Sequence, residues 1–327
     1  MPTLRVLSGN EIASAISMRE AIDLMRDGFE ALSSGRANVP IRMNMPIGEH
    51  GERALFMPAY STNHSQVGLK MVNVSPANPE RRLPFIHAIV TLSDAQTGTP
   101  LALMDGESIT SLRTGAGAGL ATEVLARPTS SVLAIFGTGV QAYTQVEAVC
   151  TVRPIKKIIV FGRSPQNTER FIGKIERRHG ITATKAKEPG QLAEADVICT
   201  ATTSMTPVFS FQHLSPGTHI NGIGSYRPDM TEIPADAVAQ AKVIVDQREA
   251  CLREAGDLIV PIQQGHFDAS HIHGELGEIL MERIQGRTND SEITFFKSVG
   301  NAIQDLVVAS FLEKRAREMK LGTEVTL

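Results

Sequence analysis

The chain has 327 residues, of which 42% are hydrophobic and 20% are charged, so it can build a sizeable core and is long enough for two domains. Its formal net charge of −3 gives no electrostatic reason to expect nucleic acid or a membrane surface as a partner, and we see neither a signal peptide nor a membrane span. The three cysteines form no C-x-x-C pair, which argues against a disulfide framework or a zinc site and leads us to expect a reducing, cytoplasmic compartment.

The N-terminal part of the chain is predicted to form a mainly antiparallel sheet with one or two helices. Ser17 and Glu20 have the spacing of a capping box, and the apolar positions that follow lie on one helical face as far as Gly35. A turn-rich stretch at residues 94–98 is typical of a hairpin connection. The expected strands are residues 41–45, 53–57, 67–75, 85–93 and 101–104.

Two basic residues of this expected sheet are candidates for chemistry. Strand alternation over residues 67–74 places Lys70 on the same face as Gly68 and Val72, so its ammonium should be partly desolvated. Desolvation lowers the pKa of a lysine and makes the ammonium a usable acid for imine or amine chemistry. The alternative is a lysine that reaches solvent at a sheet edge. Arg42 could bind a carboxylate with two hydrogen bonds, but taken alone it is better explained as an ordinary surface arginine.

Residues 105–125 have helical periodicity and an unusual run of glycine and alanine at 115–119. Such small residues weaken a helix, so we expect another part of the chain or a ligand to approach this backbone closely. Arg113 and Thr114 stand just before the run, where they could donate hydrogen bonds to a phosphate or a carboxylate. The competing interpretation is close packing of the helix on a sheet, with Arg113 in solvent.

The most informative stretch is a short apolar strand at residues 132–136 that runs directly into a glycine-rich turn. The pattern G-x-G-x-x-A, in a strand–turn–helix context, predicts a dinucleotide-binding turn. Its first glycine permits the tight turn, its second lets the backbone approach a pyrophosphate, and the phosphates lie at the N-terminus of the next helix, expected at residues 141–150. A purely structural turn is the alternative. The expected cofactor contacts here are Gly137, Thr138, Gly139, Val140 and Gln141.

A second expected strand, residues 157–161, ends where such a fold places the residue that reads the ribose. Instead of a carboxylate, this chain has Arg163 and Ser164, which suit a 2′-phosphate. We therefore favour NADP(H) as the cofactor. NAD(H) stays possible if Arg163 stacks on the adenine or faces solvent.

The remainder alternates strands with helices, which predicts an α/β fold: a doubly wound parallel sheet of the Rossmann type. A helix is expected at residues 166–180, and strands at 196–201, 218–225, 242–246 and 295–300. The polar strand ends Thr200, Thr202, Thr203, Gly224 and Ser225 are expected where the nicotinamide binds, and Ala201 is a further expected cofactor contact.

The sequence also predicts how the two domains share the chain. A long amphipathic helix at residues 301–320 can return to the first domain and make it discontinuous. We expect a first domain of the α+β class, residues 1–116 with 301–327, which carries the candidate substrate residues, and a dinucleotide-binding domain, residues 117–300. His271, His273 and Glu275 could suggest a metal site, but a solvated helix start explains their spacing better, and no metal is expected.

The sequence resembles the ornithine cyclodeaminase/μ-crystallin family over nearly its whole length. The resemblance implies the two-domain architecture argued above and a homodimer formed through the first domain. The matching segments are residues 67–70, 84–88, 97–106, 112–115, the Gly137 turn, 221–225 and 296–300, with Gln304 and Asp305.

This resemblance also assigns roles. Arg42, Lys70 and Arg113 match the positions that bind substrate in the family: the arginines hold a carboxylate, and Lys70 handles the proton on nitrogen as the catalytic residue. Arg113, with Thr114, is also expected at the cofactor phosphates. The last matching segment adds Lys297, Ser298 and Gly300 as expected cofactor contacts.

One departure from the family pattern narrows the activity. Cyclodeaminases of the family carry an aspartate where this chain has Ser225, and a serine is too weak a base for the loss of ammonia. We therefore expect a ketimine reductase that converts Δ1-pyrroline-2-carboxylate to L-proline, with the six-membered Δ1-piperideine-2-carboxylate as a further substrate. The alternatives are an ornithine cyclodeaminase, an alanine dehydrogenase, and a non-enzymatic binder of NADPH or a small ligand.

Overall fold

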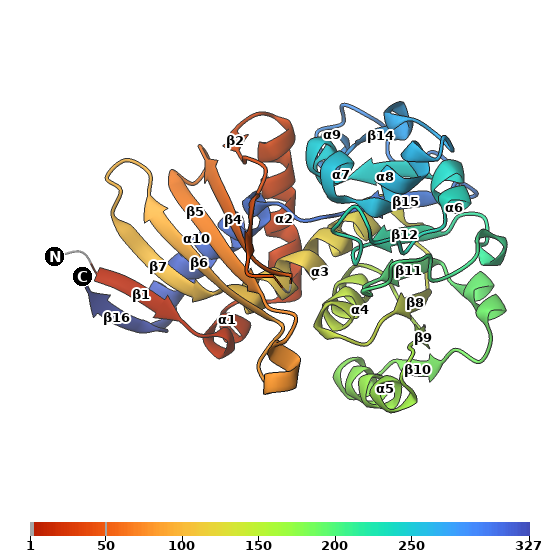
Figure 1. Cartoon of the computed structure of the whole chain (residues 1–327), viewed down its shortest axis with the longest axis horizontal. Coiled ribbons are helices and arrows are strands. Elements are labelled where there is room, and N and C mark those ends of the chain that lie inside the picture. The colour runs from red at the N-terminus through yellow and green to blue at the C-terminus, as the bar shows by residue number, and fades with distance from the viewer. Residues whose placement is uncertain (1–2, 50) are drawn as a thin grey trace. The chain divides into compact units, whose positions relative to one another are not determined.

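The computed structural model describes residues 3–49 and 51–327. The chain divides into unit 1, residues 1–113 with 301–327, and unit 2, residues 114–300 (Figure 1). The division falls inside helix α3 (Gly106–Leu125), three residues before the boundary that we predict from the sequence. Among the described residues, no helix combines the length and the apolar composition that a membrane span requires.

Unit 1 is built on a sheet with the strand order β16-β1-β7-β6-β5-β4-β2, in which β3 also pairs with β4. Neighbouring strands are antiparallel except β1 and β7, which are parallel. The predicted mainly antiparallel sheet and its hairpin are thus confirmed. The strands are β1 (Thr3–Leu7), β2 (Ala37–Asn38), β3 (Met43–Ile47), β4 (Glu52–Ser61), β5 (Gln66–Val74), β6 (Ile86–Asp94), β7 (Pro100–Asp105) and β16 (Thr323–Thr326).

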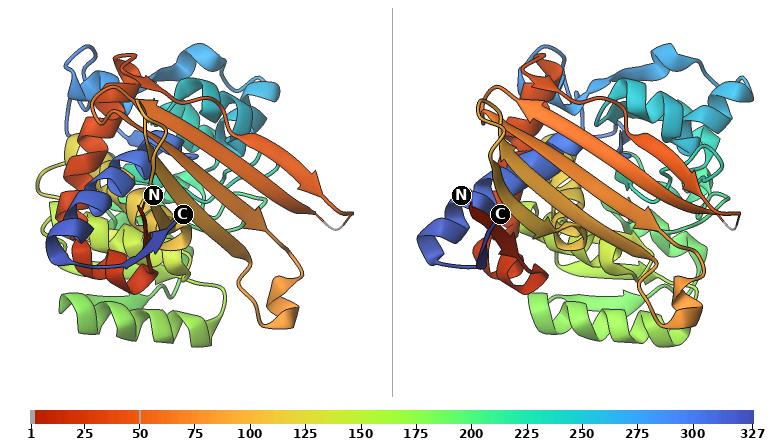
Figure 2. Two further views of the ribbon diagram at one scale, coloured as in Figure 1. Left: turned by 90° about the vertical axis from the view of Figure 1, so that its left-hand side faces the viewer. Right: turned by 60° about the vertical axis from the view of Figure 1, so that its left-hand side comes forward.

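Helices α2 and α10 supply the core on one face of this sheet (Figure 2). The capping box at Ser17 and Glu20 forms as predicted, and the buried side chains of α2 include Met25 and Phe29. Each such fully buried side chain stabilises the fold by about 1.5–3 kcal/mol. The helices of unit 1 are α1 (Gly9–Ala15), α2 (Met18–Ser33), the start of α3, α10 (Ala302–Met319) and the short η1 (Asn78–Arg81).

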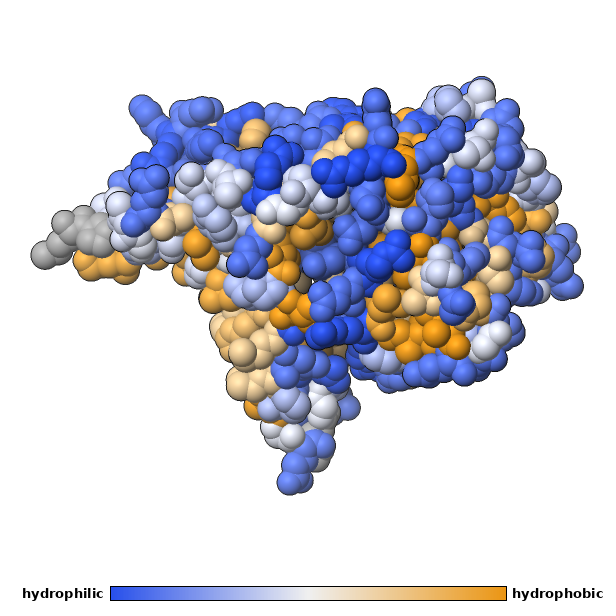
Figure 3. All heavy atoms as spheres, turned by 90° about the horizontal axis from the view of Figure 1, so that it is seen from above, coloured by the Kyte–Doolittle hydropathy of each residue, from blue (hydrophilic) through white to orange (hydrophobic). Residues whose placement is uncertain are grey.

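The opposite face of the sheet exposes several large apolar side chains. The strand register places one set of side chains from β3, β4, β5 and β6 on this face, away from α10. Hydrophobic residues reach the surface in several patches in the view of Figure 3. The large exposed apolar residues on this sheet face are Met43, Met45, Ile47, Tyr60, Val67, Leu69 and Ile89.

Some elements of unit 1 differ from the sequence prediction. Strand β3 begins at Met43, so Arg42 lies in the preceding loop and not in a strand over residues 41–45. The prediction also lacks β1, α1 and β16. Strand β16 is a short edge strand that pairs with β1, and β1 also pairs with β7. These contacts join distant parts of the chain, so local pattern does not reveal them.

Unit 2 contains a parallel sheet with the strand order β10-β9-β8-β11-β12-β15-β13-β14. The predicted α/β fold with a Rossmann-type parallel sheet is therefore confirmed. The chain reverses its direction of winding between β8 and β11, and in open parallel sheets ligands bind outside the carboxyl ends of the strands at such a point. The strands are β8 (Val132–Phe136), β9 (Lys157–Phe161), β10 (Thr182–Lys185), β11 (Val197–Thr200), β12 (His219–Gly222), β13 (Lys242–Val245), β14 (Ile272–Glu275) and β15 (Thr294–Lys297).

The helices of unit 2 follow the predicted alternation. Strands β8 and β9 match the sequence prediction residue for residue, because the central residues of both are apolar and fully buried. Residues 272–275 form strand β14, and helix α9 begins only at Leu276, so the predicted helix start at His271 is corrected. The helices are α4 (Val140–Val152), α5 (Pro165–His179), α6 (Ala235–Gln240), α7 (Arg248–Glu254), α8 (Gly256–Gln263) and α9 (Leu276–Leu280), with η2 (Pro189–Glu194), η3 (Phe211–His213) and η4 (Ala269–His271).

Candidate functional site

The glycine-rich turn of unit 2 has the two properties that the sequence predicts. Gly137 has a φ of +106°, and a Cβ there would lie 2.5 Å from the carbonyl oxygen of Ala201, so a side chain is excluded. Gly139 is the N-cap of α4, and a Cβ there would meet nothing within 4 Å. The first glycine therefore serves the fold, and the second keeps space open in front of the helix N-terminus.

A cavity of about 650 Å³ opens at this turn, at the carboxyl ends of β8, β9 and β11. None of the residues described around it is Asp or Glu, and Arg163 and Lys185 supply two cations. The size, the helix N-terminus and the two glycines fit a dinucleotide. The cavity is lined by residues 136–139, 160–164, Asn167, Lys185, Ala186, 201–204, Pro207 and Val208.

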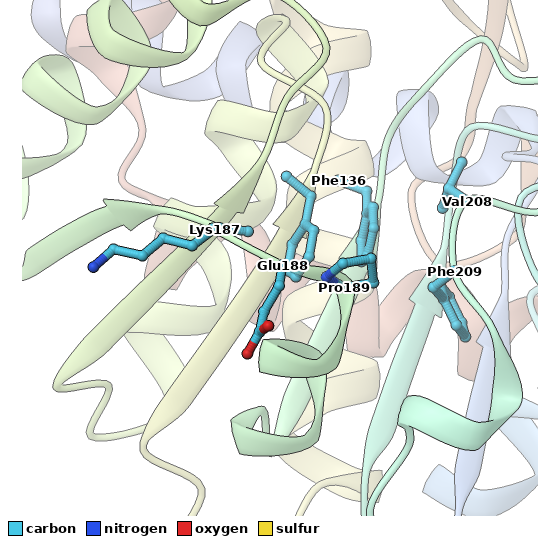
Figure 4. A pocket seen from close by; sticks show the side chains of 8 residues that line it. Phe136, Lys187, Glu188, Pro189, Val208 and Phe209 are labelled. Carbon is cyan, nitrogen blue, oxygen red and sulfur yellow. The ribbon is translucent and has the colours of Figure 1, made fainter.

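A smaller cavity of about 200 Å³ shares part of this lining and has aromatic walls. The rings of Phe136 and Phe161 stack with centroids 4.3 Å apart, and Phe209 lies 5.6 Å from Phe136. In Figure 4, Lys187 extends away from these rings. The sequence prediction missed this aromatic group, although two of its members are the last residues of predicted strands and could have been found from that position.

The predicted cofactor contacts fall into two sets. The cavity lining includes Gly137, Thr138, Gly139, Arg163, Ser164, Ala201 and Thr202. The second set, which is not part of this lining, comprises Arg113, Thr114, Val140, Gln141, Thr200, Ser225, Lys297, Ser298 and Gly300.

Several members of the second set are held by partners inside unit 2. The hydroxyl of Ser225 donates to the carbonyl of Met230 and accepts from the N–H of Asp257. The hydroxyl of Ser298 and the N–H of Gly300 both donate to the carboxylate of Asp246. These groups stabilise loops in this structure, and their cofactor contacts stay predictions.

Glu232 is a buried carboxylate that the sequence prediction missed. It accepts hydrogen bonds from the hydroxyl of Thr200 and from the N–H groups of Thr202 and Gly224. Burial, and then the negative charge of Asp257, raise its pKa. Glu232 thus joins the loops that follow β11 and β12, one of which lines the larger cavity.

The second candidate site lies in unit 1, where strand β5 places Lys70 on the covered face of the sheet. Lys70 is only 2% exposed, so its predicted burial is confirmed and the sheet-edge alternative is excluded. Its Nζ lies 2.7 Å from a carboxylate oxygen of Asp305 on α10. Burial lowers the pKa of Lys70 to about 7, with the charges of Arg113 and Arg42 acting in the same direction and Asp305 opposing them.

Arg113 completes this cluster from helix α3. Its guanidinium donates from Nε to Asp305 over 3.2 Å and from an Nη atom to the side-chain carbonyl of Gln304 over 2.6 Å. The side chain is buried, so the interpretation of Arg113 as a solvated residue is wrong. The small residues that follow Arg113 do permit close approach, as predicted, since a Cβ at Gly115 would lie 2.6 Å from the carbonyl oxygen of Thr144.

The charges in this cluster suggest what it can bind. Lys70 and Arg113 are two buried cations that share the single carboxylate of Asp305, and the charge of Arg42 also acts on Lys70. Such an excess of cations in a dry place favours a small anion such as a carboxylate. An ammonium whose pKa is about 7 can also give or take a proton at neutral pH.

The structure offers little support for metal or thiol chemistry. Within residues 3–49 and 51–327, no group of three or more His, Cys, Asp or Glu side chains is placed to hold a metal ion. The Nε2 atoms of His271 and His273 instead face the backbone carbonyls of Val238 and Gln285. Burial raises the pKa of the Cys150 and Cys199 thiols to about 12, and that of Cys251 well above its usual value, which makes all three poor nucleophiles.

The chain is similar to known proteins over nearly its whole length. A Δ1-pyrroline-2-carboxylate reductase of Bacillus cereus is 42% identical over 322 residues, which cover 98% of this chain and 99% of that protein. The structure of Thermococcus litoralis Δ1-pyrroline-2-carboxylate reductase with NADH and L-proline superimposes with a TM-score of 0.95 at 38% identity, covering 98% of this chain and 100% of that one. An archaeal alanine dehydrogenase dimer with bound NAD gives a TM-score of 0.93 at 34% identity, with 99% of both chains covered.

The sequence profile of the ornithine cyclodeaminase/mu-crystallin family matches residues 4–320. This match spans both units and includes the Gly137 turn, Lys70 and Arg113. The chain therefore belongs to the ornithine cyclodeaminase/mu-crystallin family.

Proposed function

We propose that this protein is an NAD(P)H-dependent reductase of cyclic ketimine carboxylates, which converts Δ1-pyrroline-2-carboxylate to L-proline and also accepts Δ1-piperideine-2-carboxylate. The observation that carries the proposal is the buried Lys70 beside Arg113 and Asp305. Support comes from the relatives in Bacillus cereus and Thermococcus litoralis, both named for this reaction.

In this proposal the residues of unit 1 bind the substrate. Arg113 and Arg42 hold its carboxylate by charge-assisted hydrogen bonds, which also orients the ring. The ammonium of Lys70 gives or shares its proton with the imine nitrogen and so makes the adjacent carbon more electrophilic. The bound nicotinamide supplies the hydride. One proton and one hydride add across the C=N bond, and the product is the cyclic amino acid.

Unit 2 would hold the cofactor. The backbone at Gly137 and Gly139 would cradle the pyrophosphate at the N-terminus of α4. NADP(H) is favoured, because Arg163, Ser164 and Lys185 line the cavity and no acidic residue described there would repel a 2′-phosphate. The Thermococcus and archaeal structures contain NADH and NAD, so both cofactors should be compared. Arg163→Ala should lower the kcat/KM for NADPH more than that for NADH.

A homodimer and a cytoplasmic location are further parts of the proposal. The exposed apolar face of the unit 1 sheet offers Met43, Tyr60, Leu69 and Ile89 as an interface for a second copy, in line with the archaeal relative described as a dimer. The cysteines are free thiols among the described residues, as a reducing compartment allows. Light scattering on the purified protein would give the mass in solution.

The rival functions need different groups or substrates. A cyclodeaminase needs a strong base where this chain has Ser225, whose hydroxyl is already bonded to Met230 and Asp257. An alanine dehydrogenase would take pyruvate and ammonia, and a non-enzymatic binder has no need of a buried, titrating lysine.

A panel of substrates tests the proposal and separates these rivals. Cofactor oxidation would be followed with five- and six-membered cyclic imine carboxylates and with pyruvate plus ammonia, and ammonia release with ornithine and NAD. Reduction of the cyclic imines at the highest kcat/KM is the expected result. The proposal would be overturned if the only active substrate were ornithine, if it were pyruvate with ammonia, or if none of these compounds reacted.

A further inference from the structure

The Lys70 cluster contains one acidic residue, Asp305, whose two carboxylate oxygens have different partners. One oxygen lies 2.7 Å from Nζ of Lys70, and the other lies 3.2 Å from Nε of Arg113. Asp305 is buried, so water does not screen these contacts strongly. A single carboxylate thus fixes both the proposed proton donor and the proposed carboxylate-binding arginine.

The surroundings of Lys70 make Asp305 its source of negative charge. The strand neighbours in register with Lys70 are Met57 on β4 and Val90 on β6, both apolar. The other charged groups that act on Lys70 are the cations Arg113 on α3 and Arg42 in the loop before β3. Among the charged groups that act on Lys70 in the described part of the chain, Asp305 is the one that favours its protonated form, and both arginines oppose it.

Asp305 is well placed to hold this position rigidly. It lies in the first turn of α10, where the helix dipole stabilises a negative charge. The next two residues pack closely in unit 1: Leu306 lies 3.1 Å from where a Cβ would stand at Gly68, and Val307 packs against Gly28 on α2. The carboxylate is therefore held by the core and does not depend on a mobile loop.

Gln304 reinforces the arrangement from the same helical turn. Its side-chain carbonyl accepts from Arg113 over 2.6 Å and from the backbone N–H of Asn301 over 3.2 Å. Its Nε2 is buried and has no hydrogen-bond partner within the part of the chain that the structure describes. That N–H group is thus available to an oxygen of a bound carboxylate.

From this geometry we infer that Asp305 is the positioning residue of the reduction site: it fixes the ammonium of Lys70 and the guanidinium of Arg113, and keeps Lys70 protonated for the reaction. The inference rests on the proposed function, because it assigns Asp305 a part in that same reaction. Asp305 itself exchanges no proton with the substrate and acts through Lys70 and Arg113.

The test is Asp305→Asn, which keeps the shape of the side chain and removes its charge. The loss of an opposite charge at this distance should lower the Lys70 pKa by about one unit or more. The alkaline limb of the pH profile of kcat/KM should move down by that amount, and kcat at neutral pH should fall at least tenfold. The free imine titrates in the same way in assays of the wild type and of Asp305→Asn. The difference between the two pH profiles therefore reports only groups of the enzyme. An unmoved limb would overturn the inference, whatever happens to kcat.

Two further variants separate positioning from general damage. Glu313→Gln removes another buried carboxylate of α10, one that pairs with Arg317 away from the cluster, and should leave the pH profile and kcat unchanged. Asp305→Glu keeps the charge but lengthens the side chain, so it should retain the alkaline limb and lose kcat. A limb that moves in Asp305→Glu as far as in Asp305→Asn would contradict the inference.

A readout that needs no turnover keeps this inference distinct from the proposed function. Trace acetylation with acetic anhydride across a range of pH, followed by mass spectrometry of the Lys70 peptide, reports the titration of Lys70 directly. The apparent pKa should be lower in Asp305→Asn than in the wild type even if no cyclic imine is reduced, and equal values would overturn the inference. NADPH binding, followed by nicotinamide fluorescence, shows that each variant is folded. Should Asp305→Asn fail to bind NADPH, the Lys70 pKa in Asp305→Glu is compared with that of the wild type instead. An equal pKa would support the inference, and a lower one would overturn it.

Discussion

Each unit contains a buried lysine that pairs with an aspartate, and the two ion pairs have different surroundings. Lys70 in unit 1 is 2% exposed and Lys297 in unit 2 is 0% exposed, and each contacts an aspartate within 3.0 Å. The ammonium of Lys297 also donates to the carbonyl of Gly222, and its partner Asp257 accepts from the N–H groups of Glu232 and Ile233. Lys70 instead lies beside Arg113.

Burial alone therefore does not distinguish a lysine that takes part in a reaction from one that stabilises the fold. Lys297 belongs to a network in which a carboxylate and a carbonyl satisfy the ammonium, as in a structural ion pair. Lys70 lies next to another cation and has a pKa of about 7, because burial and the neighbouring charge destabilise its protonated form. We expect removal of Lys70 to damage activity and removal of Lys297 to damage stability.

The largest expected effect is on turnover in Lys70→Met. The substitution keeps most of the side-chain volume and removes the proposed proton donor, which is typically worth about 10²- to 10⁴-fold in rate. Its midpoint in chemical denaturation should be unchanged or higher, because Asp305 keeps its contact with Arg113. Steady-state kinetics with saturating imine and a urea titration measure the two quantities. Full activity in this variant would end the assignment of Lys70 as catalytic.

Lys297→Met should give the opposite pattern. Removing one partner of a buried pair leaves the Asp257 carboxylate without its cation, which costs about 3–5 kcal/mol in the free energy of unfolding. The control is the double variant Lys297→Met with Asp257→Asn, in which the amide oxygen still accepts from the backbone without carrying a charge. It should recover part of the lost stability. A single variant as stable as the wild type, by urea denaturation, would contradict the structural role.

The stability of the protein should also depend on pH through Lys70. Lys70 has a pKa of about 7 in the folded protein against 10.5 normally, so between these values the unfolded chain binds a proton that the folded chain has released. The unfolding free energy of the wild type should therefore rise with pH relative to Lys70→Met, by about 1.4 kcal/mol per unit at most. The difference should level off below pH 7. Urea titrations of both proteins at several pH values measure it, and a flat difference would show that Lys70 is not perturbed.

Sequence pattern predicted the architecture well and the partners of each residue poorly. The parallel strands β8 and β9 could be read from apolar runs, and the burial of Lys70 from alternation along β5. Strands β1 and β16 were missed because their pairing joins the two ends of the chain. The roles of Glu232 and Asp257 were hidden for the same reason, since their hydrogen bonds reach residues 8 to 40 positions away.

The smallest expected effects come from a matched pair in unit 2, Gly137→Ala and Gly139→Ala. A Cβ at Gly137 would collide with the carbonyl of Ala201, and φ is +106°, so this variant should lose about 1–3 kcal/mol of stability. Gly139 has open space around it, so Gly139→Ala should stay within about 0.5 kcal/mol of the wild type. Because that space is where we expect the pyrophosphate, Gly139→Ala should still weaken NADPH binding, measured by nicotinamide fluorescence. Wild-type affinity in Gly139→Ala would mean that the cofactor does not approach this turn. Unit 2 would then no longer be assigned as the dinucleotide-binding unit.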